Sequence, residues 1–386
     1  MDDVRLFEAR IAMVRRFLEE EGYDGVLLSR VDNFAMATGG KRSYVNIAAD
    51  QGACSLFVSR DGKACYVGNN IEEPRVMAEE LHGFGCSVLD FLWFEGGAAE
   101  TVKQHFTGRI VSDDGAVGEN VDGKLASLRA LLTEAELEKY RRLGALAAAA
   151  MTATIQAIGP GDTEADIAAR LIAEGALRRC HVPVCLVAAD DRIGYYRHPL
   201  PSRDLLLGGG PGERKVRGYV MVVGCFAREG LWTSITRFKQ VGEAPEHIHE
   251  AHNRICAVDA VMQEATAPGK TLGDVFAACQ EAYASLGFPE NEWHNHHQGG
   301  PTGYAARTAR GMPGSDFPIL DNRYGAGLGQ AFAWNPSGVG VKSEDTFILL
   351  PDGSKEIVTA TPELPDADVS GVLGRATGVR KTGIAR

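Results

Sequence analysis

The feature that constrains this chain most is an internal repeat. Residues 160–167 and 268–275 both begin with Pro-Gly and continue with a threonine that has an aspartate three positions later. In each copy, Pro-Gly ends one predicted helix and the threonine caps the next. Strand-like apolar runs follow each second helix, at residues 184–188 in the first copy and at 332–336 and 346–350 in the second. Two such units about 108 residues apart predict a domain of two duplicated halves.

The segment before the repeat predicts a separate, smaller domain. Apolar residues recur at helical spacing from Val4 to Leu18. Short apolar runs that predict strands follow at residues 25–29, 53–58, 64–67 and 87–89. An acidic, glycine-rich stretch after them is the expected linker. We therefore predict a mixed α/β chain with an α/β domain at residues 1–125, the repeat domain at 126–360 and a flexible tail at 361–386.

Composition excludes several classes of partner. With 386 residues the chain is long enough for two domains, and a net charge of −11 disfavours nucleic acid or an anionic membrane surface as the partner. No apolar run approaches the roughly 20 residues of a membrane span, and the N-terminus has no apolar signal sequence. The eight cysteines form no CxxC pair, which favours reduced thiols. The sequence thus predicts a cytoplasmic protein that acts on a small molecule.

A histidine- and glycine-rich stretch at residues 294–304 is the expected centre of a functional site. It contains three histidines, which exchange protons near neutral pH, and three glycines, which allow a ligand to approach the backbone closely. Residues 195–201 and 334–345 are expected to join it. Another histidine group, at residues 247–252, has a spacing that zinc ligands can show, but no fourth ligand is near. We interpret that group as a solvated helix face.

The order of these motifs resembles the creatinase, prolidase and aminopeptidase P family, the pita-bread enzymes. The resemblance covers nearly the whole chain. It rests on the duplicated Pro-Gly units and on short motifs at residues 32–40, 198–201, 234–238 and 343–346. It implies a small creatinase-like α/β domain followed by a duplicated pita-bread domain, and it implies a homodimer.

Most members of this family hold two divalent metals with two aspartates, one histidine and two glutamates, a ligand set suited to two-metal hydrolysis. In this chain only the second glutamate, Glu344, is present. The other four positions fall on residues that cannot build such a centre, namely Val223 or Gly224, Ser234, Pro301 and Asn335. The resemblance therefore predicts a family member without a bound metal or another cofactor.

The metal-free branch of the family, which includes creatinase, implies roles for the remaining residues. His198 matches the proton-transferring histidine of that branch, and His297 lies where the family often keeps a second histidine. Glu344 suits general-base work if burial raises its pKa, whereas an ion pair with Lys342 or Arg237 would keep it ionised. The residues expected to bind substrate are Tyr195, Tyr196, Ser234, His294, His296, Trp334 and Asn335, together with Arg42 from the partner subunit.

The leading prediction is a metal-independent, creatinase-like hydrolase. Its default reaction is acid–base cleavage of a C–N bond in a small polar substrate that derives from an amino acid or carries a guanidino or amide group. Elimination or cyclisation would also need no metal. Two alternatives stay open, because fold alone does not fix function. One is a pita-bread protein that binds or regulates without catalysis, and the other is an Xaa-Pro dipeptidase or aminopeptidase whose metal site is placed differently in the sequence.

Overall fold

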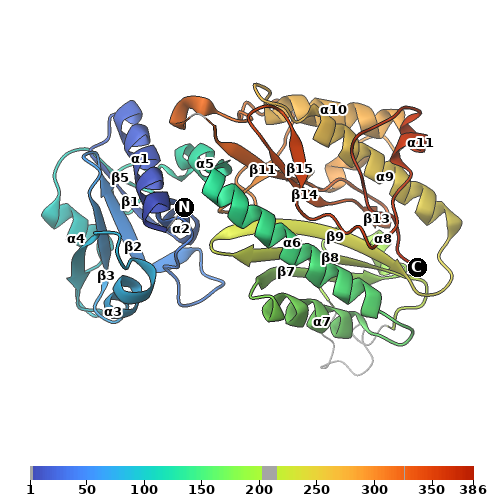
Figure 1. Ribbon diagram of the computed structural model, residues 1–386, viewed down its shortest axis with the longest axis horizontal. Helices are drawn as coiled ribbons and strands as arrows, with labels where there is room; N and C mark the ends of the chain where they lie inside the picture. Colours follow the sequence, from blue (N-terminus) through green and yellow to red (C-terminus); the bar gives the residue numbers. More distant parts are fainter. Residues whose placement is uncertain (1–2, 202–214, 326) are drawn as a thin grey trace.

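The computed structural model describes residues 3–201, 215–325 and 327–386, which form two lobes (Figure 1). The N-terminal lobe holds a five-stranded sheet in the order β4-β3-β2-β1-β5, in which β1 is antiparallel to β2 and parallel to β5. Its strands are β1 (Gly25–Arg30), β2 (Gln51–Ser59), β3 (Ala64–Asn69), β4 (Ser87–Phe91) and β5 (Ile110–Ser112). Its helices are α1 (Asp3–Glu21), α2 (Val31–Thr38), α3 (Glu73–Arg75) with a π-helix at Val76–Glu80, and α4 (Ala98–His105).

The predicted N-terminal helix is present as α1, and its apolar face packs into the core. Phe7, Val14 and Leu18 are all buried, as their helical spacing predicted. Burial of each such side chain contributes about 1.5–3 kcal/mol. Gly22 follows the helix with φ 70°, a left-handed conformation that ends helices and that other residues adopt only with strain.

The C-terminal lobe is built from two larger sheets, one two-stranded sheet and two pairs of long helices. The first half contains α6 (Glu134–Ala157), α7 (Glu164–Leu177), β7 (His181–Ala189), β8 (Tyr219–Arg228) and β9 (Leu231–Gln240). The second half contains α9 (Glu246–Ala265), α10 (Leu272–Ser285), β10 (Gly299–Thr302), β11 (Gly329–Trp334), β14 (Asp345–Leu349) and β15 (Lys355–Ile357). The shorter elements are α5 (Asp122–Ala130), β6 (Leu131–Leu132), α8 (Arg192–Tyr195), β12 (Ser337–Gly338), β13 (Val341–Lys342), α11 (Val369–Leu373) and 3-10 helices at Glu292–Asn295 and Asn322–Tyr324.

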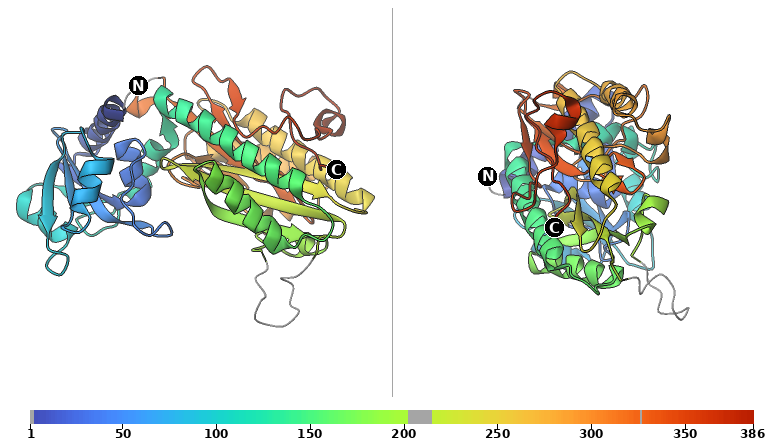
Figure 2. Two further views of the ribbon diagram at one scale, coloured as in Figure 1. Left: turned by 60° about the horizontal axis from the view of Figure 1, so that its bottom comes forward. Right: turned by 90° about the vertical axis from the view of Figure 1, so that its right-hand side faces the viewer.

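The two halves have matching sheets and matching helix starts. The strand orders are β7-β8-β9 and β10-β11-β14-β15, with β6 paired to β11, and Figure 2 shows α6 and α7 lying over the first sheet. Thr163 and Thr271 each cap a second helix by accepting the backbone N–H of Asp166 or Asp274. Each aspartate side chain in turn accepts the backbone N–H of its threonine. Such a cap contributes about 1 kcal/mol, and the predicted duplicated α/β architecture is confirmed.

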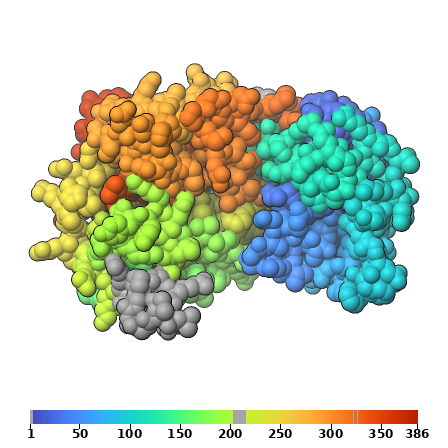
Figure 3. Space-filling model, turned by 180° about the vertical axis from the view of Figure 1, so that it is seen from behind, coloured from blue at the N-terminus to red at the C-terminus, as the bar shows by residue number. Residues whose placement is uncertain are grey.

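A buried ion pair ties the two lobes together. Arg10 of α1 is fully buried and lies 2.6 Å from the carboxylate of Glu136 on α6. Glu136 also accepts the phenol of Tyr304 at 2.5 Å. In the space-filling view the N-terminal lobe, coloured blue to teal, occupies one end of the molecule (Figure 3). The boundaries predicted at residues 125 and 360 remain predictions.

The C-terminal segment differs from the flexible tail that the sequence predicted. Lys381 is fully buried, with its Nζ 2.6 Å from the carboxylate of Asp259 on α9. The backbone N–H of Ala385 donates to the carbonyl of Phe238 on β9. The polar composition of this segment predicted mobility. In the structure, Lys381 pairs with the buried carboxylate of Asp259, and the backbone at Ala385 hydrogen-bonds to β9 at the edge of its sheet. Among the described helices, none has both the length and the apolar character needed to cross a bilayer.

Candidate functional site

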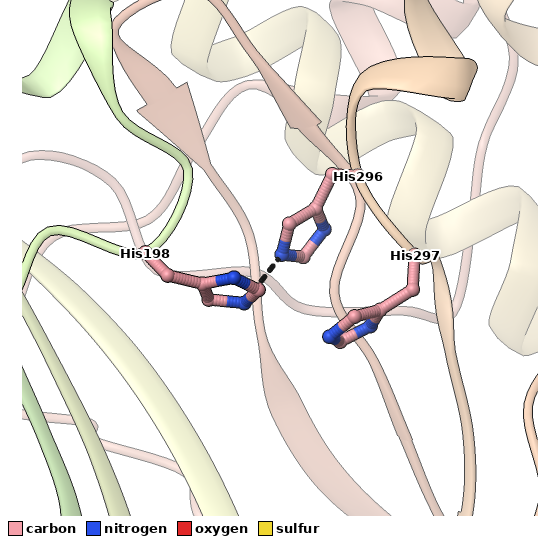
Figure 4. A group of neighbouring side chains, drawn as sticks. All are labelled: His198, His296 and His297. Atoms are coloured by element: carbon pink, nitrogen blue, oxygen red, sulfur yellow. Dashed lines mark hydrogen bonds between the residues drawn. The ribbon is translucent and has the colours of Figure 1, made fainter.

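Three of the predicted site histidines meet in space. His198 follows α8, whereas His296 and His297 lie between the 3-10 helix at Glu292–Asn295 and β10. The Nε2 atoms of His198 and His296 are 3.0 Å apart, although the two residues are 98 positions apart in the chain. The ring of His297 lies 5.3 Å from that of His198 and 4.4 Å from that of His296, measured between centroids. Figure 4 shows the three rings converging; we refer to them as the histidine cluster.

Burial and neighbouring positive charge keep the histidine cluster neutral at neutral pH. Burial, followed by the charge of Lys342, strongly lowers the pKa of His296. Burial and the charge of Arg307 lower the pKa of His297 to about 4. The pKa of His198 is also lowered, because packed neighbours partly desolvate the ring and Lys342 lies nearby, although Glu344 acts in the opposite direction. All three rings are therefore neutral near pH 7, and each carries one nitrogen lone pair.

Close contact between β10 and β11 fixes the position of the histidines. Gly299 has φ 99°, and a Cβ atom there would clash with the Ala333 carbonyl oxygen on β11. The buried side chain of Gln298 donates to the backbone carbonyls of Trp293 and His296, so it locks the loop that carries the cluster. The glycines of this loop can be recognised in the sequence, whereas the polar side chain of Gln298 gives no signal of its burial.

Glu344 is buried and surrounded by partners. Its carboxylate accepts the hydroxyl of Thr236 at 2.8 Å and the side-chain amide of Asn335 at 3.2 Å. Lys342 lies 3.5 Å away and Arg307 lies 3.6 Å away. Burial by itself would raise the pKa of Glu344, but the two cations and the hydrogen bonds from Thr236 and Asn335 together outweigh it and hold the pKa below its usual value. Of the two possibilities for Glu344, the structure places it in an ion pair that keeps it ionised.

Arg307 was not predicted as a site residue, whereas Lys342 was expected only as a possible ion-pair partner of Glu344. Lys342 is buried beside Glu344, and Arg307 donates to the backbone carbonyls of Gly300 and Ala333. Lys342 ends β13 and Glu344 lies in the short connection before β14, so their closeness in the sequence was the usable signal. No local sequence pattern pointed to Arg307. Its side chain comes close to Glu344 only because the second half of the C-terminal lobe folds.

Ser234 faces a thiol rather than a carboxylate. In the β8–β9 hairpin it pairs with Cys225, and the Cys225 Sγ lies 3.2 Å from the Ser234 Oγ. The sequence had considered Val223 and Gly224 for the first aspartate position, but the residue directly opposite Ser234 is Cys225. Burial raises the pKa of the Cys225 thiol to about 11, so the pair is neutral.

The residues present do not fit the two-metal centre that most members of the resembling family hold. A pair of divalent metals requires several carboxylate ligands. The Glu344 carboxylate contacts a hydroxyl, an amide and two cationic side chains. The two protein cations already neutralise the carboxylate, so the positive charge that metals would supply comes from the chain itself.

Several predicted binding residues lie outside this group. Trp334 is fully buried and donates its Nε1–H to Thr266, so it belongs to the core. Tyr195 and Tyr196 are exposed and contact each other edge to face.

His294 packs against Trp293 rather than joining the histidine cluster. Arg42 pairs with Glu80 in the N-terminal lobe, and its role toward a partner subunit remains a prediction.

The histidine group at residues 247–252 does not converge. His249 contacts Gln240, whereas His252 is buried against the ring of Phe238. Within the described part of the chain, the histidine cluster is the one group of three residues whose ligand atoms could reach a single metal ion.

Relatives of known type resemble this chain in sequence and in fold. The probable dipeptidase PepE of Mycobacterium tuberculosis is 26% identical over 260 residues, which cover 64% of this chain and 63% of that protein. This chain thus spans about 63% of the length of the curated relatives it matches. The crystal structure of dipeptidase PepE from Mycobacterium ulcerans matches with a TM-score of 0.72 and 17% identity, over 94% of this chain and 97% of that one.

A second solved structure and a family model agree. The Xaa-Pro dipeptidase from Bacillus anthracis matches with a TM-score of 0.69 and 17% identity, over 92% of this chain and 97% of that one. At this identity the two structures establish the fold alone. The family model described as metallopeptidase family M24 matches residues 138–349, more than half of the chain. This chain therefore belongs to metallopeptidase family M24.

Proposed function

We propose that this protein hydrolyses a C–N bond in a small peptide-like substrate of the dipeptide class. Family M24 membership supports hydrolysis, and the relatives named as dipeptidases favour the dipeptidase alternative over the metal-independent, creatinase-like prediction. The site supports this substrate class without the two-metal centre. The observation that carries the proposal is the placement of neutral imidazoles beside a fixed group of opposite charges, formed by Glu344, Lys342 and Arg307.

The charges of the site suit a substrate with a carboxylate. Lys342 and Arg307 supply two positive charges for the one negative charge of Glu344. Arg307 also lines a cavity of about 730 Å³ between the lobes, together with Trp232 and Arg228, whereas the histidine cluster lies outside the lining of this cavity. Pockets for small ligands commonly measure about 300–1,000 Å³, so this cavity has room for a dipeptide. A guanidino substrate would bring a further positive charge next to these cations.

The neutral histidines suit proton transfer. His198 is exposed, and its Nε2 contacts the Nε2 of His296. A neutral imidazole can take a proton from the attacking water and pass it to the leaving nitrogen as the C–N bond breaks. We assign this step to His198. His297 is then positioned to hold the carbonyl oxygen, and Glu344 keeps Lys342 and Arg307 in place.

A substrate panel with matched variants tests the proposal. Purified protein is incubated with Xaa-Pro dipeptides, other dipeptides and a guanidino acid, and released products are measured by mass spectrometry. Dipeptide turnover is expected, and His198→Ala should reduce kcat by about 10²- to 10⁴-fold. His294→Ala is the control, because His294 lies outside the histidine cluster.

The other outcomes separate the alternatives. If the protein turned over the guanidino acid but no dipeptide, the creatinase-like prediction would be favoured over the dipeptidase proposal. Dipeptide binding without turnover in the wild-type protein would support a binding protein instead.

A further inference from the structure

We propose that the histidine cluster binds a single divalent transition-metal ion of the zinc class. One ligand nitrogen from each of His198, His296 and His297 lies within 4.8 Å of the other two. In a tetrahedral zinc site, with Zn–N near 2.0–2.1 Å, two ligand nitrogens lie roughly 3.4 Å apart. The 3.0 Å between the Nε2 atoms of His198 and His296 is already close to that spacing. Only His297 has to approach, and its ring already faces the other two (Figure 4).

The contact between His198 and His296 brings two ligand nitrogens together. It is an N–H···N hydrogen bond of 3.0 Å in which one neutral imidazole donates to the other, and a metal ion can replace the shared proton by taking a lone pair from each nitrogen. His296 is only 8% exposed, so its nitrogen is held in place rather than free to turn toward water. Three imidazoles and one open position are the coordination of many catalytic zinc sites.

The residues around the histidine cluster predict that the bound ion exchanges with solution rather than staying permanently bound. Metal-bound histidines usually donate their second ring nitrogen to an acceptor, which strengthens the site. The Nδ1 atoms of His296 and His297 are buried without such a partner. The positive charges of Lys342 and Arg307 also oppose a cation, and Glu344 offsets them in part. Removal of the Lys342 charge should therefore tighten binding.

The proposed site differs from the family's metal centre in donors and in number. It uses three imidazoles and one ion, whereas the family's centre uses mostly carboxylates and two ions. The binding itself does not depend on the proposed hydrolysis. Its catalytic meaning does rest on that function, because a metal-bound water would replace the free imidazole of His198 as the activated group.

The experiment measures zinc stoichiometry on the full-length protein. Chelated protein is dialysed to equilibrium against zinc sulfate, the zinc inside and outside the dialysis membrane is measured by elemental mass spectrometry, and cobalt absorption spectra report the coordination. About one ion per chain with a tetrahedral cobalt spectrum is expected. His296→Ala and His198→Ala should lose the ion, whereas the control His294→Ala should keep it. Circular dichroism verifies that each variant is folded, and Lys342→Met should bind zinc more tightly than wild type.

Two results would overturn the proposal. One is no retained zinc in wild type at concentrations that saturate other three-histidine sites. The other is two ions per chain that persist in His296→Ala and disappear in Glu344→Gln, which would restore the family's centre. Zinc binding without turnover of any dipeptide would leave this inference standing and remove the proposed function. Turnover of a dipeptide by protein without any bound metal would remove this inference and leave the proposed function standing, with proton transfer assigned to His198.

Discussion

Cys225 lies directly opposite Ser234 across the β8–β9 hairpin, with its Sγ 3.2 Å from the Ser234 Oγ. Neither side chain is charged, since the thiol pKa is raised to about 11 by burial and by the nearby charge of Glu344. A nucleophilic cysteine requires a lowered pKa. We therefore regard Cys225 as a neutral hydrogen-bonding group in the wall of the site.

The first prediction concerns this thiol. Cys225→Ser should keep most of the hydrolytic activity, because the hydroxyl can maintain the contact with Ser234. In the wild-type protein at pH 7.5, an alkylating reagent should modify Cys225 far more slowly than it modifies a free thiol, since almost no thiolate is present. Peptide mapping after alkylation measures this rate. Rapid labelling of Cys225, or abolished activity in a folded Cys225→Ser protein, would point to a nucleophilic thiol.

The second prediction concerns the ion pair of Glu344 and Lys342, which are both nearly inaccessible. Glu344→Gln leaves the buried Lys342 without its counter-charge, so unfolding free energy should fall by about 3 kcal/mol. Adding Lys342→Met should recover part of that loss, because the uncompensated charge is gone. Urea denaturation of the two single variants and the double variant measures the coupling. Asp61→Asn, which alters an exposed pair with Lys63, is the control and should change little.

The third prediction concerns the C-terminal segment. Lys381→Met leaves the buried Asp259 unpaired and should lower the unfolding free energy by about 3–5 kcal/mol. The neighbouring Arg380 pairs with the exposed Asp366, so the control Arg380→Met should cost less than about 1 kcal/mol. Denaturant titration compares the two variants. Equal stability of Lys381→Met and wild type would mean that the segment is detached in solution.

The fourth prediction concerns His252 and acid stability. Burial, with the charges of His249 and Arg237, lowers the His252 pKa to about 3, whereas the unfolded value is about 6.5. The unfolded state therefore binds one more proton between these pH values. Stability from neutral His252 is present above pH 6.5 and falls by about 1.4 kcal/mol for each pH unit below it.

Comparison with a variant isolates that contribution. His252→Gln cannot titrate, so the stability difference between wild type and variant should shrink as the pH falls from 7 to 5. Denaturation with urea at each pH provides the values. The exposed His247→Gln is the control and should show a constant difference. A constant difference for His252→Gln as well would mean that His252 keeps an ordinary pKa in the folded protein.

Local features of the fold could be predicted because their causes lie within a few residues. The caps at Thr163 and Thr271 each need only an aspartate three positions later, and both form. The apolar spacing of α1 likewise fixes which face is buried. Motif order was sufficient to identify the family, because each motif marks the same strand or turn in relation to the repeat.

Features that depend on distant partners could not be predicted from the local sequence. Trp334 was expected near substrate, but the packing of its strand directs it into the core. The polar tail was expected to be flexible, but Asp259 supplies a buried charge that Lys381 neutralises. Composition does not show that a basic residue has such a partner more than a hundred positions away.

By itself, the sequence determined the duplicated architecture and the family, and it placed histidines in the two stretches at residues 195–201 and 294–304. Only the tertiary structure decided that His198 meets His296 and that Lys342 and Arg307 neutralise Glu344. Capping and periodicity are local effects written in neighbouring residues. The meeting of side chains from different sheets depends instead on how the two halves pack, which is a property of the whole folded chain.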